Sequence, residues 1–294
     1  MTDSPTYRQI GVIGAGRVAR ALALALAPHS AASPLLWARS AGSARTAVDQ
    51  IGSAVASDRI EALVRASDLI AIAVSDDAIA PVVAEIAAFA PTGSAPFIFH
   101  VSGRSGAEIL DPLHAAGAAT AAIHPVMTFT GDPQNEVARM IGARFAITGS
   151  SADATAQARQ VVRLLGGVAV EIREEHRPLY HAALCHAANH LVTLISGAAH
   201  ALTRAGVDDP HALVAPLVRA ALENSLEHGF GALSGPLLRG DGETIGNHLD
   251  ALKRDCPELL PAYRAMARAT LDQLERSGAP APSSSLRTAL SSKD

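Results

Sequence analysis

The stretch that decides the fold is GVIGAGRVAR, residues 11–20. A continuously apolar run typical of a buried strand leads into it, and an alanine-rich segment with helical periodicity follows it. Between a strand and a helix, the G-x-G-x-x-A run at residues 14–19 is typical of a turn that holds the pyrophosphate of a dinucleotide at the helix N-terminus. An ordinary glycine turn is the alternative. The residues expected to contact the cofactor here are Gly14, Ala15, Gly16, Arg17 and Val18.

The order of strands and helices predicts an α/β domain followed by an all-α domain. Short apolar runs predict strands at Ile10–Ile13, Leu35–Ala38, Leu69–Val74, Phe97–Val101, Thr120–Ile123, Arg144–Ile147 and Val168–Ile172. Because these runs are apolar throughout and alternate with helical segments, they predict a Rossmann-like, doubly wound parallel sheet. The later segments His181–Arg204, Pro210–Glu227, Thr244–Lys253 and Pro257–Glu275 are helical in pattern. We expect domains at residues 1–172 and 173–278, and a Pro/Ser-rich, unstructured tail at 279–294.

The composition excludes several classes of protein. The 294 residues include 24 basic and 28 acidic side chains and no basic stripe, which argues against a nucleic-acid partner. The polar N-terminus lacks the pattern of a secretory signal, and the apolar run at residues 21–27 is too short to span a membrane. Two cysteines without C-x-x-C spacing fit a reducing compartment. We expect a cytoplasmic protein with no membrane or nucleic-acid partner.

The end of the second predicted strand indicates which dinucleotide binds. An NAD site places a carboxylate there to bind the ribose 2′-hydroxyl. This chain has Arg39 and Ser40 instead, with Arg45 near in sequence. A guanidinium and a hydroxyl suit a 2′-phosphate, so we expect NADP(H), although Arg39 as a solvated loop residue is the alternative.

Polar residues also follow three other predicted strands, at the edge where open α/β sheets bind ligands. Val74, Ser75 and Asp76 are expected to line the cofactor site, although Asp76 at a helix start also suits a cap. Ser102 and His124 are expected to converge near the nicotinamide as catalytic residues, the alternative being turn residues.

The helical half carries further polar side chains. His181, Cys185 and Asn189 are spaced to share one helix face, and His181 and Asn189 are expected to take part in catalysis. The interhelical loop SGPLLRGDGETIGNHL, residues 234–249, offers Arg239, Thr244 and His248 as substrate-binding residues, the alternative being a turn and a capped helix. His186 and His190 form an i, i+4 pair without a third ligand in the sequence pattern, so no metal site is expected.

The motifs GVIGAGRVA, SDLIAIAVSDDAI, HVSG, IHPVMTF, YHAALCHAANHL and SGPLLRGDGETIGNHL resemble a family of bacterial reductase-like proteins, over about residues 8–275. These proteins join a Rossmann-like domain to a helical domain of unassigned function. They are similar to pyrroline-5-carboxylate reductase, prephenate dehydrogenase, ketopantoate reductase and the 6-phosphogluconate dehydrogenase-like β-hydroxyacid dehydrogenases. The resemblance to prephenate dehydrogenases implies catalytic roles for Ser102 and His124. It also implies a homodimer formed through the helical domain.

One position departs from that pattern. The β-hydroxyacid dehydrogenases carry a catalytic lysine in a K-x-x-x-N helix motif, and this chain has Cys185 at the lysine position and Asn189 at the asparagine. We therefore expect an NADP(H)-dependent oxidoreductase that reduces a C=O or C=N bond of a small anionic metabolite, such as a ketopantoate-like 2-oxo acid, with His124 or His181 moving the proton. The missing lysine keeps a non-catalytic NADP(H)-binding sensor as the alternative.

Overall fold

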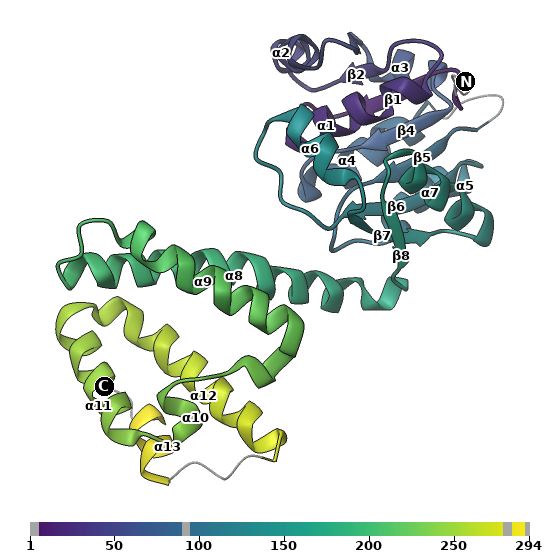
Figure 1. The fold of residues 1–294 in the computed structure, drawn as a ribbon. Coiled ribbons are helices and arrows are strands. Elements are labelled where there is room, and N and C mark those ends of the chain that lie inside the picture. The colour runs from purple at the N-terminus through teal and green to yellow at the C-terminus, as the bar shows by residue number, and fades with distance from the viewer. Residues whose placement is uncertain (1–5, 90–94, 279–283, 292–294) are drawn as a thin grey trace. The chain divides into compact units, whose positions relative to one another are not determined.

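The computed structural model describes residues 6–89, 95–278 and 284–291, which form two compact units, Met1–Cys185 and His186–Asp294 (Figure 1). The boundary lies inside helix α8 (Arg177–Arg204). The sequence pattern predicts a boundary after residue 172, whereas the boundary between the two units lies after residue 185. The physical reason is that the first turns of α8 pack on the sheet, where Arg177 donates hydrogen bonds to Thr148 and Ala146.

The first unit is built on a sheet whose strand order is β3-β2-β1-β4-β5-β6-β7-β8 in the described residues. The strands are β1 (Ile10–Ile13), β2 (Leu35–Trp37), β3 (Val55–Ala56), β4 (Leu69–Ile72), β5 (Phe97–His100), β6 (Ala119–Pro125), β7 (Arg144–Gly149) and β8 (Val168–Glu171). All neighbours are parallel except β6 and β7. The expected doubly wound sheet is therefore confirmed. The two-residue β3 was not predicted, because it is too short to show a pattern.

Helices cover both faces of this sheet. The helices are α1 (Arg17–Leu26), α2 (Ala41–Ile51), α3 (Ile60–Ala66), α4 (Asp76–Ala87), α5 (Asp111–Ala115), α6 (Pro133–Met140) and α7 (Ala152–Leu164), with short 3-10 turns at Ala27–His29, Ala107–Leu110 and Glu174–His176. Helices α1, α2, α6 and α7 share one buried core with the sheet, and α3, α4 and α5 share the other. Alternate strand residues enter opposite cores, as Val12 and Ile13 do.

The connections place four strand ends at one edge of the sheet. Strands β1, β4, β5 and β6 are neighbours and run parallel, so their carboxyl ends lie side by side. Chain order reverses between β1 and β4, which is the point where open α/β sheets bind ligands.

The second unit is helical. It contains the remainder of α8, then α9 (Pro210–His228), α10 (Pro236–Arg239), α11 (Gly242–Asp255), α12 (Leu260–Arg276) and α13 (Ser284–Ser291), with 3-10 turns at Gly229–Ala232 and Pro257–Leu259. Its core is a cluster of leucines and other apolar residues on α11, α12 and α13. In contrast, α9 buries none of its side chains.

The tail differs from the sequence-based expectation. Residues 279–294 were expected to be unstructured, but Ser284–Ser291 forms helix α13, and its Leu286 and Leu290 are buried in the core of the second unit. For this segment the prediction is wrong. Four-residue spacing places the two leucines on one helix face, and that short apolar face is masked in a Pro/Ser-rich composition. The rest of the expected tail, 279–283 and 292–294, lies outside the described residues.

Candidate active site

The glycine turn after β1 has the geometry of a pyrophosphate site. Gly14 has a φ of +130°, and a Cβ on it would lie 2.3 Å from the carbonyl oxygen of Ala73. Gly16 is the N-cap of α1, and a Cβ on it would meet no atom within 4 Å. The first glycine is thus required by the backbone, whereas the second leaves open space in front of a helix N-terminus. That space suits an anion, because the first N–H groups of a helix have no partner within the helix.

A pocket of about 680 Å³ opens in front of this turn, within the first unit. It lies between the ends of β1, β2 and β4, at the switch point of the sheet. Its lining residues are Gly14, Ala15, Gly16, Trp37, Ala38, Arg39, Ser40, Ser43, Ala73, Val74, Ser75, Asp77, Ala78, Pro81, Val82 and Glu85. Of the residues expected to bind the cofactor, this pocket contains Gly14, Ala15, Gly16, Arg39, Ser40, Val74 and Ser75.

Part of this pocket is lined by the Arg39 guanidinium and by the N-terminus of α2. Arg39 and Ser40 are exposed, and Ser40 caps α2 by accepting a 3.2 Å hydrogen bond from the backbone N–H of Ser43. Since Ser43 also lines the pocket, the N-terminus of α2 faces the same space as the Arg39 side chain. This arrangement can receive a phosphate group.

Four residues expected at the cofactor site do not line this pocket. Arg17 donates a 3.1 Å hydrogen bond to the carbonyl oxygen of Phe129, and Val18 packs against the core. Arg45 is exposed on α2. Asp76 forms an ion pair with Arg104, whose Nε atom lies 3.3 Å from Oδ2 of Asp76.

Asp77, rather than Asp76, brings a carboxylate to the pocket. The pKa of Asp77 is held below its usual value, chiefly by a hydrogen bond from the Ser75 hydroxyl. The backbone N–H of Asp77 and the nearby Arg39 guanidinium lower this pKa further. Ser75 and Asp77 therefore bind each other at the start of α4. The Asp77 carboxylate also places a negative charge near the Arg39 guanidinium.

His124, at the end of β6, faces Tyr180 from the first turn of α8. The Nδ1 atom of His124 lies 2.7 Å from the Tyr180 hydroxyl oxygen, and the two rings meet edge to face. Burial, together with the charges of Arg177 and His181, lowers the pKa of His124 to about 4. Burial raises the pKa of Tyr180 to about 12, although Arg177 opposes that shift. Both groups are therefore neutral at pH 7.

Arg177 supplies a buried positive charge beneath this pair. Its side chain is fully buried, donates to the Thr148 hydroxyl at 2.7 Å and to the Ala146 carbonyl oxygen at 3.2 Å, and lies 5.7 Å from the centre of the Tyr180 ring. Among the described residues its Nη1 atom has no hydrogen-bond partner. A buried guanidinium beside a phenol favours the phenolate, so Arg177 is placed to stabilise negative charge on Tyr180.

The turn after β5 holds the backbone close to both imidazoles. A Cβ on Gly103 would lie 2.9 Å from Nε2 of His124 and 2.9 Å from Cδ2 of His181. His100 fixes this turn, because it is buried, its Nδ1 accepts from the backbone N–H of Ser102, and its Nε2 lies 2.7 Å from the Gly106 carbonyl oxygen. The Ser102 hydroxyl accepts a 3.4 Å bond from the Ser105 N–H.

The structure brings His124 and His181 together at the turn that contains Ser102, and their catalytic roles stay predictions. His181 is half-buried, and its Nε2 atom lies 3.7 Å from Sγ of Cys185. Ser102 is buried, and its hydroxyl serves the turn, which is the alternative that the sequence left open.

The other expected site residues belong to the second unit, where their roles stay predictions. Asn189 and Arg239 are exposed. Thr244 donates its hydroxyl to Asp241 at 2.7 Å and is part of the N-cap of α11, which matches the alternative reading of that loop. The Nδ1 atom of His248 lies 2.8 Å from the hydroxyl of Tyr263.

Three residues of this site were given no role in the sequence-based prediction, namely Tyr180, Arg177 and His100. Tyr180 lies one residue before His181 in the same motif, but an aromatic residue in an amphipathic helix is far more often a packing residue than a catalytic one. Arg177 gave no signal, since its burial depends on contacts with β6 and β7. His100 stands at a strand end, so position alone does not separate it from Ser102.

Comparison with known families and structures agrees with this architecture. Residues 3–125 match a family described as a Rossmann-like domain, and residues 143–270 match a domain of unknown function, DUF2520. None of the curated proteins compared with the chain matches it.

Several solved structures share the fold. A candidate NADP oxidoreductase of Bacteroides fragilis is 23% identical, with a TM-score of 0.73 over 91% of this chain and 99% of its own. A reductive aminase of Aspergillus terreus, in complex with NADPH and ethyl-5-oxohexanoate, is 19% identical, with a TM-score of 0.69 over 97% and 98%. A pyrroline carboxylate reductase of Plasmodium falciparum with NADP bound is 14% identical, with a TM-score of 0.60 over 98% and 100%. The two family matches follow one another along the chain, in the order of domains that its motifs predicted.

Proposed function

We propose that this protein is an NADP(H)-dependent oxidoreductase that transfers hydride to a C=O or C=N bond of a small anionic metabolite. One observation carries the proposal: the dinucleotide pocket and the His124–Tyr180 pair lie at the same edge of one sheet. The ends of β4 and β6 are two strand spacings apart, roughly 10 Å, which a bound dinucleotide can span. Similar folds that bind NADPH in a reductive aminase and NADP in a pyrroline carboxylate reductase support this assignment.

The chain has groups suited to each part of NADP(H). The turn at Gly14 and Gly16 would hold the pyrophosphate at the N-terminus of α1. Arg39, with Ser40 and Ser43 at the start of α2, would hold the 2′-phosphate. When bound, the cofactor supplies the hydride, and the protein supplies position and charge.

The His124–Tyr180 pair would supply the proton. A neutral Tyr180 that donates to Nδ1 leaves the ring proton of His124 on Nε2, next to the Gly103 backbone. During reduction of the substrate, Nε2 would give its proton to the substrate oxygen or nitrogen, and Nδ1 would take the proton of Tyr180. The resulting phenolate faces Arg177, whose positive charge favours it. His124 then acts as a relay, because its low pKa makes an imidazolium donor scarce at pH 7.

The assay that tests this proposal follows NADPH absorbance with a panel of 2-oxo acids, cyclic imines and a deazaflavin. Turnover with a 2-oxo acid or an imine supports the proposed activity. Tight NADPH binding without turnover across the panel supports the second candidate, a non-catalytic NADP(H) sensor. The observation that favours this second candidate is Cys185 at the position of the missing lysine.

We also propose that the protein is a cytoplasmic homodimer whose helical units pair. The segment Glu174–Arg204 is long and apolar enough to cross a membrane by length and composition alone. It carries polar side chains that are costly in hydrocarbon, namely His181, His186, Asn189, His190 and His200. Together with the exposed leucines of α9, its apolar side chains are better explained by a second copy of the chain than by lipid.

A further inference from the structure

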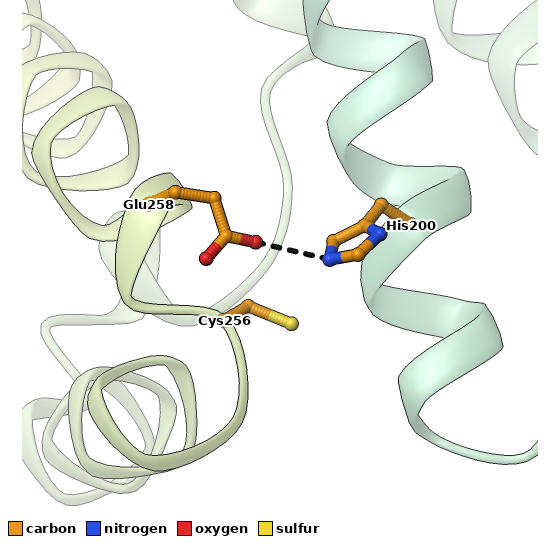
Figure 2. Close-up of side chains that lie close together, drawn as sticks. All are labelled: His200, Cys256 and Glu258. Carbon is orange, nitrogen blue, oxygen red and sulfur yellow. Dashed lines mark ion pairs between the residues drawn. The ribbon is translucent and has the colours of Figure 1, made fainter.

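We propose that the second unit contains a binding site for a borderline transition metal ion, Zn²⁺ by preference, formed by His200, Cys256 and Glu258. The three side chains converge in Figure 2 from α8 and from the turn between α11 and α12. One ligand atom from each, the imidazole nitrogen, Sγ and a carboxylate oxygen, lie within 4.8 Å of one another. No metal site was expected from the sequence, because the His186 and His190 pair offers only two ligands.

The chemistry of the three donors selects the metal. A thiolate is a soft ligand, an imidazole is intermediate and a carboxylate is hard, and Zn²⁺ accepts all three. Mg²⁺ and Ca²⁺ prefer oxygen ligands only. Around a tetrahedral zinc with bonds of about 2.0–2.3 Å, ligand atoms are separated by about 3.3–3.7 Å. The largest separation of up to 4.8 Å must therefore shrink by about 1.1–1.5 Å, which side-chain rotation can supply.

The backbone already holds the ligands together. Cys256 is buried, at 2% exposure, and its backbone N–H donates to the Leu252 carbonyl oxygen at the end of α11. Helix α8 lies directly against the next turn, because a Cβ on Gly197 would come 3.0 Å from Cδ2 of Leu259. The ends of the His200 and Glu258 side chains already meet, with Nε2 and Oε1 3.0 Å apart.

The site is open to solvent on one side. His200 and Glu258 have side-chain exposures of 53% and 56%, so a metal ion can enter. Both residues also line a surface pocket of about 570 Å³, with residues 192, 193, 196 and 197 of α8 and Leu259. Three protein ligands leave a fourth position of a tetrahedral ion for water or a small anion from this pocket. A bound ion would also tie α8 to the α11–α12 turn.

The test is a Co²⁺ titration of the full chain, freed of metal with a chelator. Cobalt bound by a thiolate gives a sulfur-to-metal charge-transfer band in the near ultraviolet. We expect one Co²⁺ per chain with this band, displaced by Zn²⁺ but not by Mg²⁺, and a higher Tm with Zn²⁺. Cys256→Ser should abolish the band, and His200→Ala and Glu258→Gln should weaken binding at least tenfold. The last two change exposed side chains, so they test the site even if Cys256→Ser fails to fold.

Cys185→Ser and His186→Ala are the matched controls, and we expect both to bind Co²⁺ as the unaltered chain does. The His186–His190 pair, with its Nδ1 atoms 3.1 Å apart, has no sulfur and cannot give the band. The proposal is overturned if no charge-transfer band forms, if the band survives Cys256→Ser, or if His200→Ala and Glu258→Gln bind as tightly as the unaltered chain. Binding that depends on His186 would overturn it as well.

Discussion

At the scale of single residues, the proton relay predicts different effects for three neighbouring substitutions. His124→Ala should lower turnover by roughly 10²–10⁴ and leave NADPH affinity nearly unchanged, because His124 is outside the dinucleotide pocket. Tyr180→Phe should also lower turnover, because it removes the hydroxyl that donates to Nδ1 and returns a proton to the imidazole. His181→Ala is the comparison variant. If it loses turnover while His124→Ala keeps it, the proton donor is on α8 instead of β6.

His100 predicts a pH dependence of stability. Burial lowers its pKa from the usual 6.5 to about 4 in the folded chain. Between these values the unfolded chain binds a proton that the folded chain does not, so the free energy of unfolding falls as pH falls from about 6.5 to about 4. His100 alone should remove on the order of 2 kcal/mol between pH 7 and pH 5.

Urea unfolding at the two pH values measures this loss. His100→Gln should destabilise the protein at pH 7 and flatten the pH dependence, with the remaining slope coming from His124. An unchanged slope in His100→Gln would show that other groups control acid stability.

At the scale of elements, most of the fold was predictable and part of the site was not. Continuously apolar strands in alternation with helices predict the sheet, and the glycine run predicts its binding edge. Tyr180 and Arg177 were not predictable, because their roles depend on where α8 starts and on what it meets across the sheet. Helix α4 starts at Asp76, and its first turn carries two carboxylates, so apolar periodicity does not mark where it begins.

Helix α13 predicts that the C-terminal segment contributes to the stability of the second unit. Leu290 is fully buried in the core with α12. Leu290→Ala should lower the free energy of unfolding by about 2–4 kcal/mol, because it leaves a cavity. The exposed Ser291→Ala is the control and should change it by less than about 0.5 kcal/mol. Chemical unfolding measures both free energies. Equal stability of the two variants would contradict the contribution of α13 to the core.

At the scale of the whole molecule, the proposed dimer predicts a mass of twice 30.2 kDa by light scattering at micromolar concentration. Leu217 and Leu226 are 70% and 80% exposed and belong to a group of exposed leucines on α9, and grouped exposed apolar side chains are typical of an interaction surface. Leu217→Glu combined with Leu226→Glu should therefore give monomers. Ile141→Glu, an equally exposed apolar position in the first unit, should leave the dimer intact. A monomeric unaltered chain would refute the pairing of the helical units.

The central claim is that one sheet edge binds NADP(H), and calorimetric titration with NADPH and NADH tests it most directly. We predict one NADPH per chain, bound more tightly than NADH, because Arg39, Ser40 and Ser43 line the pocket and would bind the 2′-phosphate. Arg39→Asp should weaken NADPH binding by about tenfold to a hundredfold, the scale of one charged hydrogen bond, and leave NADH binding equal or better. Equal affinity of the unaltered protein for NADH and NADPH, or no binding of either, would contradict the account.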